Sequence, residues 1–218
     1  MSTLSRIARE GIRLGHLRAL EERLGLAGYE RIAGVDEAGR GALAGPVVAA
    51  AVIVDPRRPV PGVDDSKRLT AAVRERLAVW IRETALAWSV VAVDAATIDR
   101  SNILEATRLA TRRALAGLRP APDVVITDAL PLAGLGIPCL PLVHGDALCH
   151  AVASASILAK VERDRLLGEL EARWPEYGFA EHKGYGSARH LAALAERGPA
   201  PEHRLTFARV LPRLGRAA

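Results

Sequence analysis

The chain has 218 residues, half of them apolar, which is long enough for one hydrophobic core and short for two. Its 30 Lys and Arg outnumber its 25 Asp and Glu and give a pI near 9.7, which favours a polyanionic partner without identifying one. The N-terminal segment is charged every few residues, so neither a signal peptide nor a membrane span of about 20 apolar residues is expected. These properties predict a soluble, cytoplasmic protein.

The apolar pattern predicts alternating helices and strands. The expected strands are 31–36, 47–54, 88–93, 123–128 and 137–143, and the expected helices are 4–24, 70–86, 103–118, 147–174, 187–197 and 207–214. The first helix is interpreted as a docked element ahead of the main domain. Early strands followed by mixed strands and helices indicate an α/β domain with a mixed central sheet flanked by helices.

The two cysteines, Cys139 and Cys149, are too far apart for a Cys-x-x-Cys redox or zinc motif. A chain of this size does not need a disulfide to stabilise its fold. We therefore expect both to be buried free thiols.

Four acidic residues occupy distinctive places in this pattern. Asp36 and Glu37 close the first expected strand, Asp128 closes a later one, and Asp146 precedes the longest expected helix. Because ligand sites of open α/β sheets form beyond strand ends, carboxylates far apart in sequence can converge there. Three or four hard oxygen ligands suit Mg²⁺ or Mn²⁺, and clustered carboxylates need such cations because they repel one another. The sequence therefore predicts a divalent-metal site.

Each acid also has a simpler interpretation. A single acid is commonly a solvated surface residue, and for Asp146 a helix-capping role is the alternative. Neighbouring strand residues face opposite sides of a sheet, so Asp36 and Glu37 can serve one site only if the strand bends or ends there. The glycines that follow them allow such a bend.

Ordered sequence blocks around these acids resemble those of the ribonuclease HII family. The blocks are GVDEAGRGALAGPVVAAAVIV at 34–54, DDSKRL at 64–69, ITD at 126–128, HGDA at 144–147 followed by SASILAKVERD at 154–164, HKGYGS at 182–187 and EHRLTF at 202–207. The resemblance spans residues 31–207, and blocks in a fixed order are more specific than a lone glycine motif. It implies a ribonuclease H-like fold, with residues 1–30 as an N-terminal helical extension and 31–218 as the catalytic domain with its C-terminal helical region.

The resemblance also implies an activity. It predicts a metal-dependent endonuclease that hydrolyses the RNA strand of RNA/DNA hybrids and cuts 5′ of ribonucleotides embedded in duplex DNA, leaving 3′-hydroxyl and 5′-phosphate ends. The family's catalytic and metal-binding acids correspond to the four selected above: Asp36, Glu37, Asp128 and Asp146. Its substrate-binding glycine-arginine-glycine motif and tyrosine correspond to Gly39, Arg40, Gly41 and Tyr185.

Two positions depart from the pattern of many members. Ala42 stands where proline is common, and Ala129 stands where glycine follows the third acid. Both changes affect loop geometry more than chemistry. The helix expected at 4–24 lies outside the matched core, and no role is assigned to it.

Two divalent ions about 4 Å apart can activate a water, neutralise charge on the phosphate and stabilise the leaving alkoxide. Asp36 is expected to bridge both ions. Glu37 and Asp128 are expected to complete one coordination shell, and Asp146 the other.

Selectivity for RNA requires contacts that sense the 2′-hydroxyl. Glycines at 39 and 41 would let backbone groups approach that sugar. Tyr185, between two glycines, is expected to stack on the neighbouring deoxyribose, and the alternative is a core or hinge tyrosine.

The chain contains only three lysines, and each falls in a matched block: Lys67, Lys160 and Lys183. A compact ammonium group suits a single phosphate oxygen or a carboxylate, so these lysines are expected to contact substrate. For Lys160 the alternative is an ion pair with Asp164, four residues on.

Two other functions remain open from the sequence. Another two-metal nuclease of this fold, such as a junction resolvase or a transposase-like enzyme, would share the carboxylates but lack the later blocks in this order. A noncatalytic module that binds RNA-containing duplexes would use the basic surface, since phosphate contacts alone give affinity. The expected partners are nucleic acids and no membrane, with a monomeric chain and a sliding clamp as a further partner to be tested.

Overall fold

The computed structural model describes residues 3–211, which form a five-stranded mixed sheet. Its strands are β1 (Ile32–Ala38), β2 (Val47–Ile53), β3 (Ala87–Val93), β4 (Val124–Asp128) and β5 (Cys139–Leu142). The spatial order is β3-β2-β1-β4-β5, with antiparallel pairing among β1, β2 and β3 and parallel pairing from β1 through β4 to β5. The change from antiparallel to parallel pairing therefore occurs at the central strand, β1.

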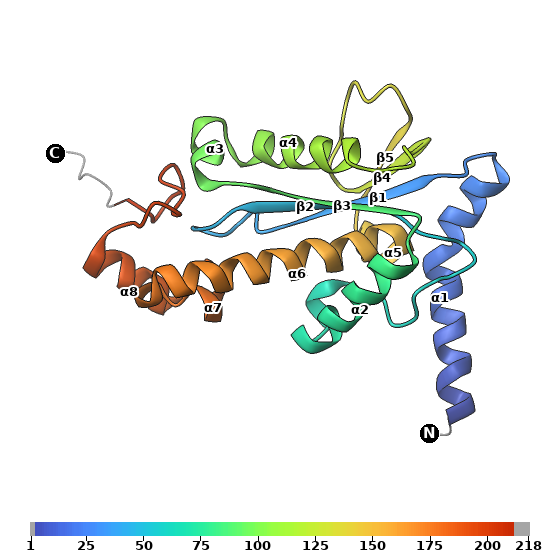
Figure 1. Cartoon of the computed structure of the whole chain (residues 1–218), viewed down its shortest axis with the longest axis horizontal. Coiled ribbons are helices and arrows are strands. Elements are labelled where there is room, and N and C mark those ends of the chain that lie inside the picture. The colour runs from blue at the N-terminus through green and yellow to red at the C-terminus, as the bar shows by residue number, and fades with distance from the viewer. Residues whose placement is uncertain (1–2, 212–218) are drawn as a thin grey trace.

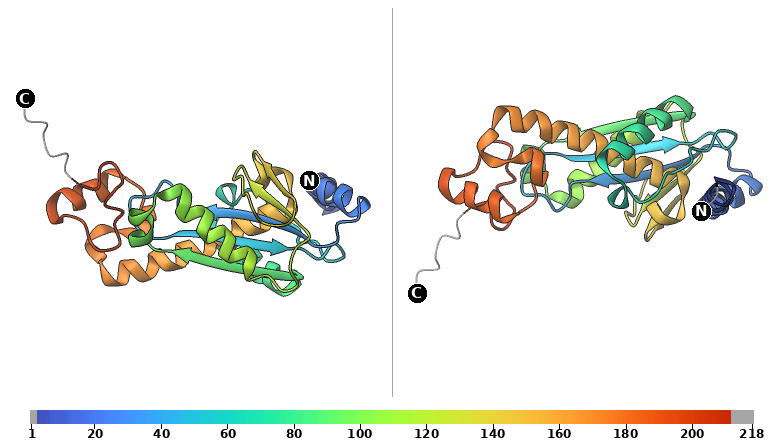
Figure 2. Two further views of the ribbon diagram at one scale, coloured as in Figure 1. Left: turned by 90° about the horizontal axis from the view of Figure 1, so that it is seen from above. Right: turned by 90° about the horizontal axis from the view of Figure 1, so that it is seen from below.

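The helices of the described residues are α1 (Thr3–Leu26), α2 (Ala71–Thr84), α3 (Ala95–Arg100), α4 (Ile103–Ala116), α5 (Gly145–Leu148), α6 (His150–Arg173), α7 (Phe179–His182) and α8 (Ala188–Arg197), with 3-10 turns η1 (Ser66–Arg68) and η2 (Pro175–Tyr177). α4 covers one face of the sheet, and α6 covers the other with α2 beside it (Figure 1). α1 lies at one end of the elongated molecule and α8 at the opposite end (Figure 2). The predicted mixed sheet flanked by helices is confirmed.

α6 lies directly against β1 because both contribute small residues at the contact. The first part of α6 is rich in Ala and Ser, and every residue from His150 to Ala159 is buried. A Cβ atom on Gly34 of β1 would lie only 2.1 Å from the carbonyl carbon of Ala151, so only glycine fits there. The close approach brings the side chains of α6 to the centre of the sheet.

Three sequence-based boundaries are wrong. The helix expected at 147–174 is divided, because Cys149 has an extended backbone (φ −138°, ψ 124°) between α5 and α6. The first strand continues to Ala38, since its antiparallel pairing with β2 extends that far, so Asp36 lies within the strand rather than at its end. Residues 207–211 form turns rather than a helix, and the left-handed φ of 79° at Arg209 interrupts helical geometry. Residues 212–214 of that expected helix lie outside the described residues.

The cysteines form no disulfide within residues 3–211. Cys149 is fully buried, whereas Cys139 is only partly buried because it lies on β5, an edge strand. The expectation of a buried free thiol is confirmed for Cys149 and wrong for Cys139. Among the helices of the described part of the chain, none has the length and apolarity to cross a membrane.

Candidate active site

The predicted acids meet where the parallel pairing of β1 with β4 ends. The last residues in that pairing are Val35 and Thr127, and Asp36 and Asp128 follow them directly. Because parallel strands end at the same edge of a sheet, the two acids are spatial neighbours despite their separation in sequence. The N–H of Gly145, the residue before Asp146, donates a 2.9 Å hydrogen bond to Asp128 Oδ1 and holds α5 beside them.

Three carboxylates form a compact cluster. Asp36, Asp128 and Asp146 each offer an oxygen within 4.8 Å of the other two. Asp36 is 7 % exposed and Asp146 is 5 % exposed, so two of the three charges are largely removed from water. Hard oxygen donors at this spacing fit Mg²⁺ or Mn²⁺. The structure brings these three acids together, and their catalytic role stays a prediction.

Glu37 lines the same cleft but is not part of this cluster among the described acids. Its Oε1 lies 3.1 Å from Arg40 Nη1, and its backbone N–H donates a 2.7 Å hydrogen bond to Asp36 Oδ1. Adjacent strand residues ordinarily face opposite sides of a sheet, yet Asp36 and Glu37 both reach the cleft. Both acids follow the last residue of β1 that pairs with β4, so β4 no longer covers that edge of β1 beside them.

Asp146 is not a helix N-cap. His144 is the N-cap of α5 and Cys149 is the N-cap of α6, so the capping alternative is wrong. The Asp146 carboxylate instead lies 3.8 Å from Lys67 Nζ. Burial raises the pKa of Asp146, and the charge of Asp65, a further acid that the sequence patterns do not indicate, adds to this.

Burial and like charge both oppose ionisation of Asp36. Burial raises the pKa of Asp36 well above its ordinary value, the charge of Glu37 adds to this, and the Ser156 hydroxyl opposes it by hydrogen bonding. Burial likewise raises the pKa of Glu37, against the effect of Arg40. A divalent cation would offset these penalties, so the electrostatics and the donor set favour the same ligand.

The predicted substrate-binding residues line the same cleft, whose volume is about 470 Å³: Gly39, Arg40, Gly41 and Tyr185. Tyr185 is 44 % exposed, so the alternative of a core tyrosine is wrong. A Cβ atom on Gly41 would lie 3.9 Å from the Tyr185 ring, so the surface between them is open. The loop after β1 and the loop before α8 therefore face one another across the cleft.

Arg163 of α6 is a site residue that the sequence analysis missed. It is fully buried, and its guanidinium donates hydrogen bonds of 3.2, 3.1 and 2.9 Å to the carbonyls of Ala44, Pro46 and Lys183. The guanidinium also lies over the Tyr185 ring, 5.5 Å from its centroid. Gly39 has φ +94°, and a Cβ there would lie 1.9 Å from Arg163 Nε, so this glycine accommodates the arginine. Arg163 thus joins the two loops that are predicted to bind substrate to α6.

A helical spacing could have indicated Arg163. Ser156, Lys160 and Arg163 recur at the i, i+4 and i+7 positions of α6, and all three line the cleft. Ser156 also lies 2.9 Å from the hydroxyl of Ser66 in η1. One face of α6 is therefore a wall of the site.

The three lysines have different surroundings. Lys67 is exposed at the cleft beside Asp146. Lys160 also lines the cleft, but its Nζ lies 2.7 Å from Asp164 Oδ1, so the ion-pair alternative is confirmed. Lys183 is not among the described residues that line the cleft, and its backbone is left-handed with φ 52°.

One departure from the family pattern lies where the backbone has a positive φ. Ala129, directly after Asp128, has a φ of 50°, in the left-handed region that glycine adopts without strain. Ala42 is fully buried. These positions support loop geometry, as expected, and neither side chain lines the cleft among the described residues.

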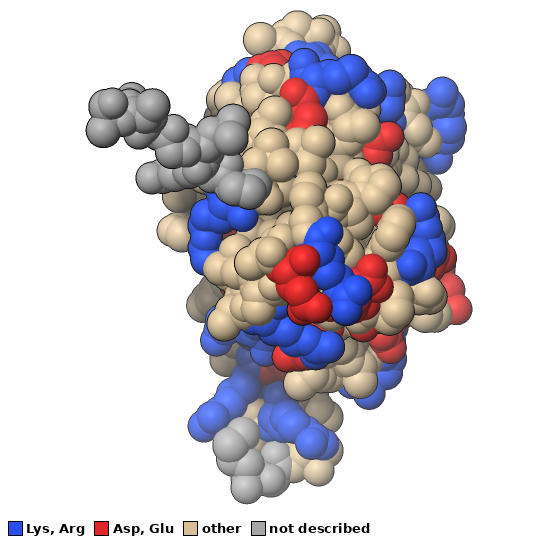
Figure 3. All heavy atoms as spheres, turned by 90° about the vertical axis from the view of Figure 1, so that its left-hand side faces the viewer, with Lys and Arg blue, Asp and Glu red and all other residues tan. Residues whose placement is uncertain are grey.

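Basic and acidic residues alternate on the end of the molecule opposite α1. Figure 3 shows Lys and Arg there interspersed with Asp and Glu rather than gathered into one continuous patch. This face therefore shows no continuous basic patch for a polyanionic partner.

Comparisons with known proteins point to one family. A family model described as Ribonuclease HII matches residues 33–210. The ribonuclease HII of Desulfitobacterium hafniense (strain DSM 10664 / DCB-2) is 50 % identical over 205 residues, which cover 94 % of this chain and 79 % of that protein. The solved structure of ribonuclease H2 from Pyrococcus horikoshii OT3 gives a TM-score of 0.73 at 29 % identity, covering 83 % of this chain and 95 % of that one. The PCNA:RNase HII complex from Archaeoglobus fulgidus contains a chain with a TM-score of 0.69 at 29 % identity, covering 82 % and 95 %.

In metal-free buffer, Asp36→Asn is expected to raise the free energy of unfolding at pH 7. The pKa of Asp36 is raised in the folded protein, so folding opposes its ionisation. For a carboxyl this penalty is present above the unfolded pKa of about 4 and disappears below it. The stabilisation should therefore shrink as the pH falls from 7 toward about 4, which urea unfolding with chelator present measures.

Asp94→Asn is the control, because the pKa of Asp94 is shifted in the opposite direction from that of Asp36. Hydrogen bonds from Thr97 lower the pKa of Asp94, so removing its charge should leave the free energy of unfolding at pH 7 unchanged or reduced. A gain for Asp36→Asn of equal size at both pH values would contradict the electrostatic explanation.

Proposed function

The chain belongs to the ribonuclease HII family, and on that basis we propose that it cuts duplex DNA 5′ of embedded ribonucleotides, leaving 3′-hydroxyl and 5′-phosphate ends. Membership makes it an endoribonuclease of the type 2 ribonuclease H class, acting on RNA/DNA hybrids. The observation that carries the finer proposal is the cluster of Asp36, Asp128 and Asp146, with oxygens within 4.8 Å, at a cleft lined by Gly41 and Tyr185. One site thus combines hard oxygen donors for a metal ion with two loops that leave room for a sugar between them.

Enzymes of this family depend on a divalent metal, and Mg²⁺ or Mn²⁺ is the ion proposed here. Asp36, Asp128 and Asp146 would hold it, and when bound it would supply an activated water and neutralise charge on the phosphate. Asp36 is proposed as an essential member of this ligand set. Glu37 is proposed as the fourth acid, because it lines the cleft beside Asp36.

Lys67 is the lysine best placed to contact a scissile phosphate. It is exposed at the cleft, and although partial burial lowers its pKa, the charges of Asp65 and Asp146 raise it more. Lys67 therefore stays charged at neutral pH. Lys160 and Lys183 are proposed to act indirectly, because the first is paired with Asp164 and the second contacts Arg163 through its carbonyl.

Discrimination of RNA from DNA is proposed to arise from backbone groups around Gly41. Gly41 is exposed and a side chain there would narrow the space in front of Tyr185. Backbone N–H and C=O groups can both engage a 2′-hydroxyl, which is a donor and an acceptor. Tyr185 is proposed to stack on the adjoining deoxyribose, held in orientation by the guanidinium of Arg163.

The two rival functions fit the observations less well. The family model extends over residues 33–210, which argues against a junction resolvase or a transposase-like nuclease. A noncatalytic duplex-binding module has no need for three acids gathered in one place, and such gathering is unfavourable without a cation.

A sliding clamp is proposed as a protein partner, with the chain acting as a monomer. Support for the clamp comes from the Archaeoglobus fulgidus RNase HII, whose structure is a complex with PCNA. The basic C-terminal segment from residue 212 lies outside the described residues, and no docking motif is assigned to it.

The proposal is tested with a labelled DNA duplex that contains one ribonucleotide, beside an all-DNA duplex and a full RNA/DNA hybrid. With Mg²⁺ or Mn²⁺, cleavage is expected only 5′ of the ribonucleotide and within the hybrid. Asp36→Asn should reduce cleavage to the level seen with chelator, since the cluster loses a charged ligand. Metal-dependent cutting of plain DNA or of four-way junctions, with the ribonucleotide ignored, would move the protein to a rival nuclease function.

Tyr185 is expected to contribute through its ring rather than its hydroxyl. Tyr185→Phe should retain activity, whereas Tyr185→Ala should lower kcat/KM on the embedded ribonucleotide about tenfold, within the range of about 1–3 kcal/mol typical of aromatic stacking. Tyr29→Ala serves as a control, because this tyrosine lies beside α1 and outside the catalytic cleft. Equal activity of all three variants would exclude stacking by Tyr185.

A further inference from the structure

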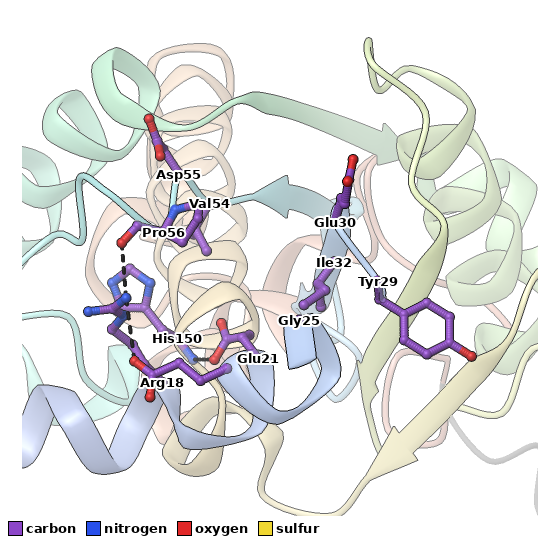
Figure 4. A pocket seen from close by; sticks show the side chains of 11 residues that line it. Arg18, Glu21, Gly25, Tyr29, Glu30, Ile32, Val54, Asp55, Pro56 and His150 are labelled. Carbon is purple, nitrogen blue, oxygen red and sulfur yellow. Dashed lines mark hydrogen bonds and ion pairs between the residues drawn. The ribbon is translucent and has the colours of Figure 1, made fainter. Parts of the chain in front are cut away.

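α1 docks against the end of the sheet, ahead of the segment that the family model matches. Leu14 and Leu17 are the buried residues of α1, and a cavity of about 330 Å³ lies between α1, the start of β1 and the segment after β2. Figure 4 shows side chains of α1 crossing this cavity toward Pro56 and His150. The polar contacts of α1 are concentrated on two segments that lead to the acidic site.

The first of these segments is the start of α6. The N-cap residue of α6, Cys149, makes no side-chain capping hydrogen bond within residues 3–211. Glu21 of α1 supplies the cap instead: its carboxylate accepts hydrogen bonds from the N–H groups of His150 at 3.3 Å and Ala151 at 2.7 Å. It also accepts a hydrogen bond from the Cys149 thiol. A carboxylate is well suited to the positive N-terminus of a 24-residue helix.

The second segment is the loop that leads into η1. Glu10 Oε1 accepts a 2.7 Å hydrogen bond from the N–H of Gly62, and Arg13 Nη1 donates a 2.7 Å hydrogen bond to the carbonyl of Val63. Glu10 and Arg13 also form an ion pair with each other. Asp65 and Lys67 follow this loop immediately.

These two segments meet at Asp146. Asp146 lies on α5, a helix of four residues that joins α6 at Cys149, and it faces Lys67 at 3.8 Å. Unlike Asp36 and Asp128, it is not on a strand of the sheet, so its position against two neighbouring carboxylates depends on what holds the α5–α6 junction. Besides the ion pair with Lys67, the hydrogen bond from Gly145 to Asp128 lies on one side of Asp146 and the cap from Glu21 lies on the other.

We propose that α1 is a positioning element for the metal site, and that Glu21, by capping α6, holds Asp146 where it can share a cation with Asp36 and Asp128. The inference rests on the proposed metal site and extends it to a part of the chain outside the matched family segment. Glu21 is a positioning residue, since it touches the α5–α6 junction and none of the three acids.

The test compares Glu21→Ala with Glu22→Ala in the full-length chain. Glu22 is the neighbouring residue on α1, more than half exposed and paired with Arg18, so its loss removes a similar charge from the same helix without removing the cap. Two readouts need no nucleic acid: the Mn²⁺ dissociation constant from calorimetry, and the alkylation rate of Cys149 followed by mass spectrometry. Cys139, which lies on β5 and is partly exposed, is the internal reference for alkylation.

Loss of the Glu21 cap is expected to weaken Mn²⁺ binding by about 2- to 30-fold, the range that corresponds to losing a helix cap. Cys149, now fully buried, should be alkylated faster, while Cys139 should be unchanged. Glu21→Gln retains an acceptor oxygen and should fall between Glu21→Ala and the unaltered protein. Glu22→Ala should match the unaltered protein in both readouts.

If Glu21→Ala lowers the melting temperature but matches Glu22→Ala in Mn²⁺ affinity and Cys149 alkylation, both measured well below that temperature, α1 is only a stabilising element and the proposal is overturned. The proposed substrate could be wrong without affecting this test of α1. A chain that binds Mn²⁺ normally but ignores ribonucleotides would refute that substrate assignment, while the Glu21 comparison would still decide the role of α1.

Discussion

Mutual repulsion among three carboxylates within 4.8 Å is the constraint on which the rest of this structure depends. Strand pairing fixes two of them, because Asp36 and Asp128 follow the last residues paired between β1 and β4. The third is brought in by a single backbone hydrogen bond to Asp128 and by the junction of α5 with α6. The fold therefore holds an unfavourable charge arrangement in place, and a divalent cation is the ligand that converts the arrangement into a favourable one.

α6 is the element that connects this cluster with the loops proposed to bind substrate. Glu21 caps its N-terminus, and Ser156, in the second turn, hydrogen bonds to Asp36. Arg163, near the centre of the helix, contacts the loops that contain Gly39 and Tyr185. The same helix lies directly on Gly34 of the central strand. A displacement of α6 would therefore disturb the proposed metal ligands and the proposed sugar contacts together.

Much of the fold and the acidic cluster could be predicted from local patterns. The apolar runs before Asp36 and Asp128 predict two strands, and the parallel pairing of β1 with β4 brings the two acids together, although β1 continues beyond Asp36 to Ala38. The resemblance of the ordered blocks then selected the same acids. Boundaries were less predictable, because the extended residue Cys149 divides a helix whose periodicity continues on both sides.

Contacts between distant segments could not be predicted in this way. The cap of α6 by Glu21 joins residues 129 positions apart, and Arg163 reaches a carbonyl 119 positions away. Neither pairing leaves a periodic signal, because each depends on how whole elements pack. Glu37 shows the same limit at short range: adjacent to Asp36 in sequence, it is paired with Arg40 and stands outside the oxygen cluster of the described residues.

Anomalous diffraction from a crystal soaked in Mn²⁺ would show whether these three acids hold a cation. An anomalous peak bounded by carboxylate oxygens of Asp36, Asp128 and Asp146 is expected, and it should be lost when Asp36 is replaced by Asn. A crystal that takes up Mn²⁺ elsewhere, with none between these three acids, would contradict this expectation.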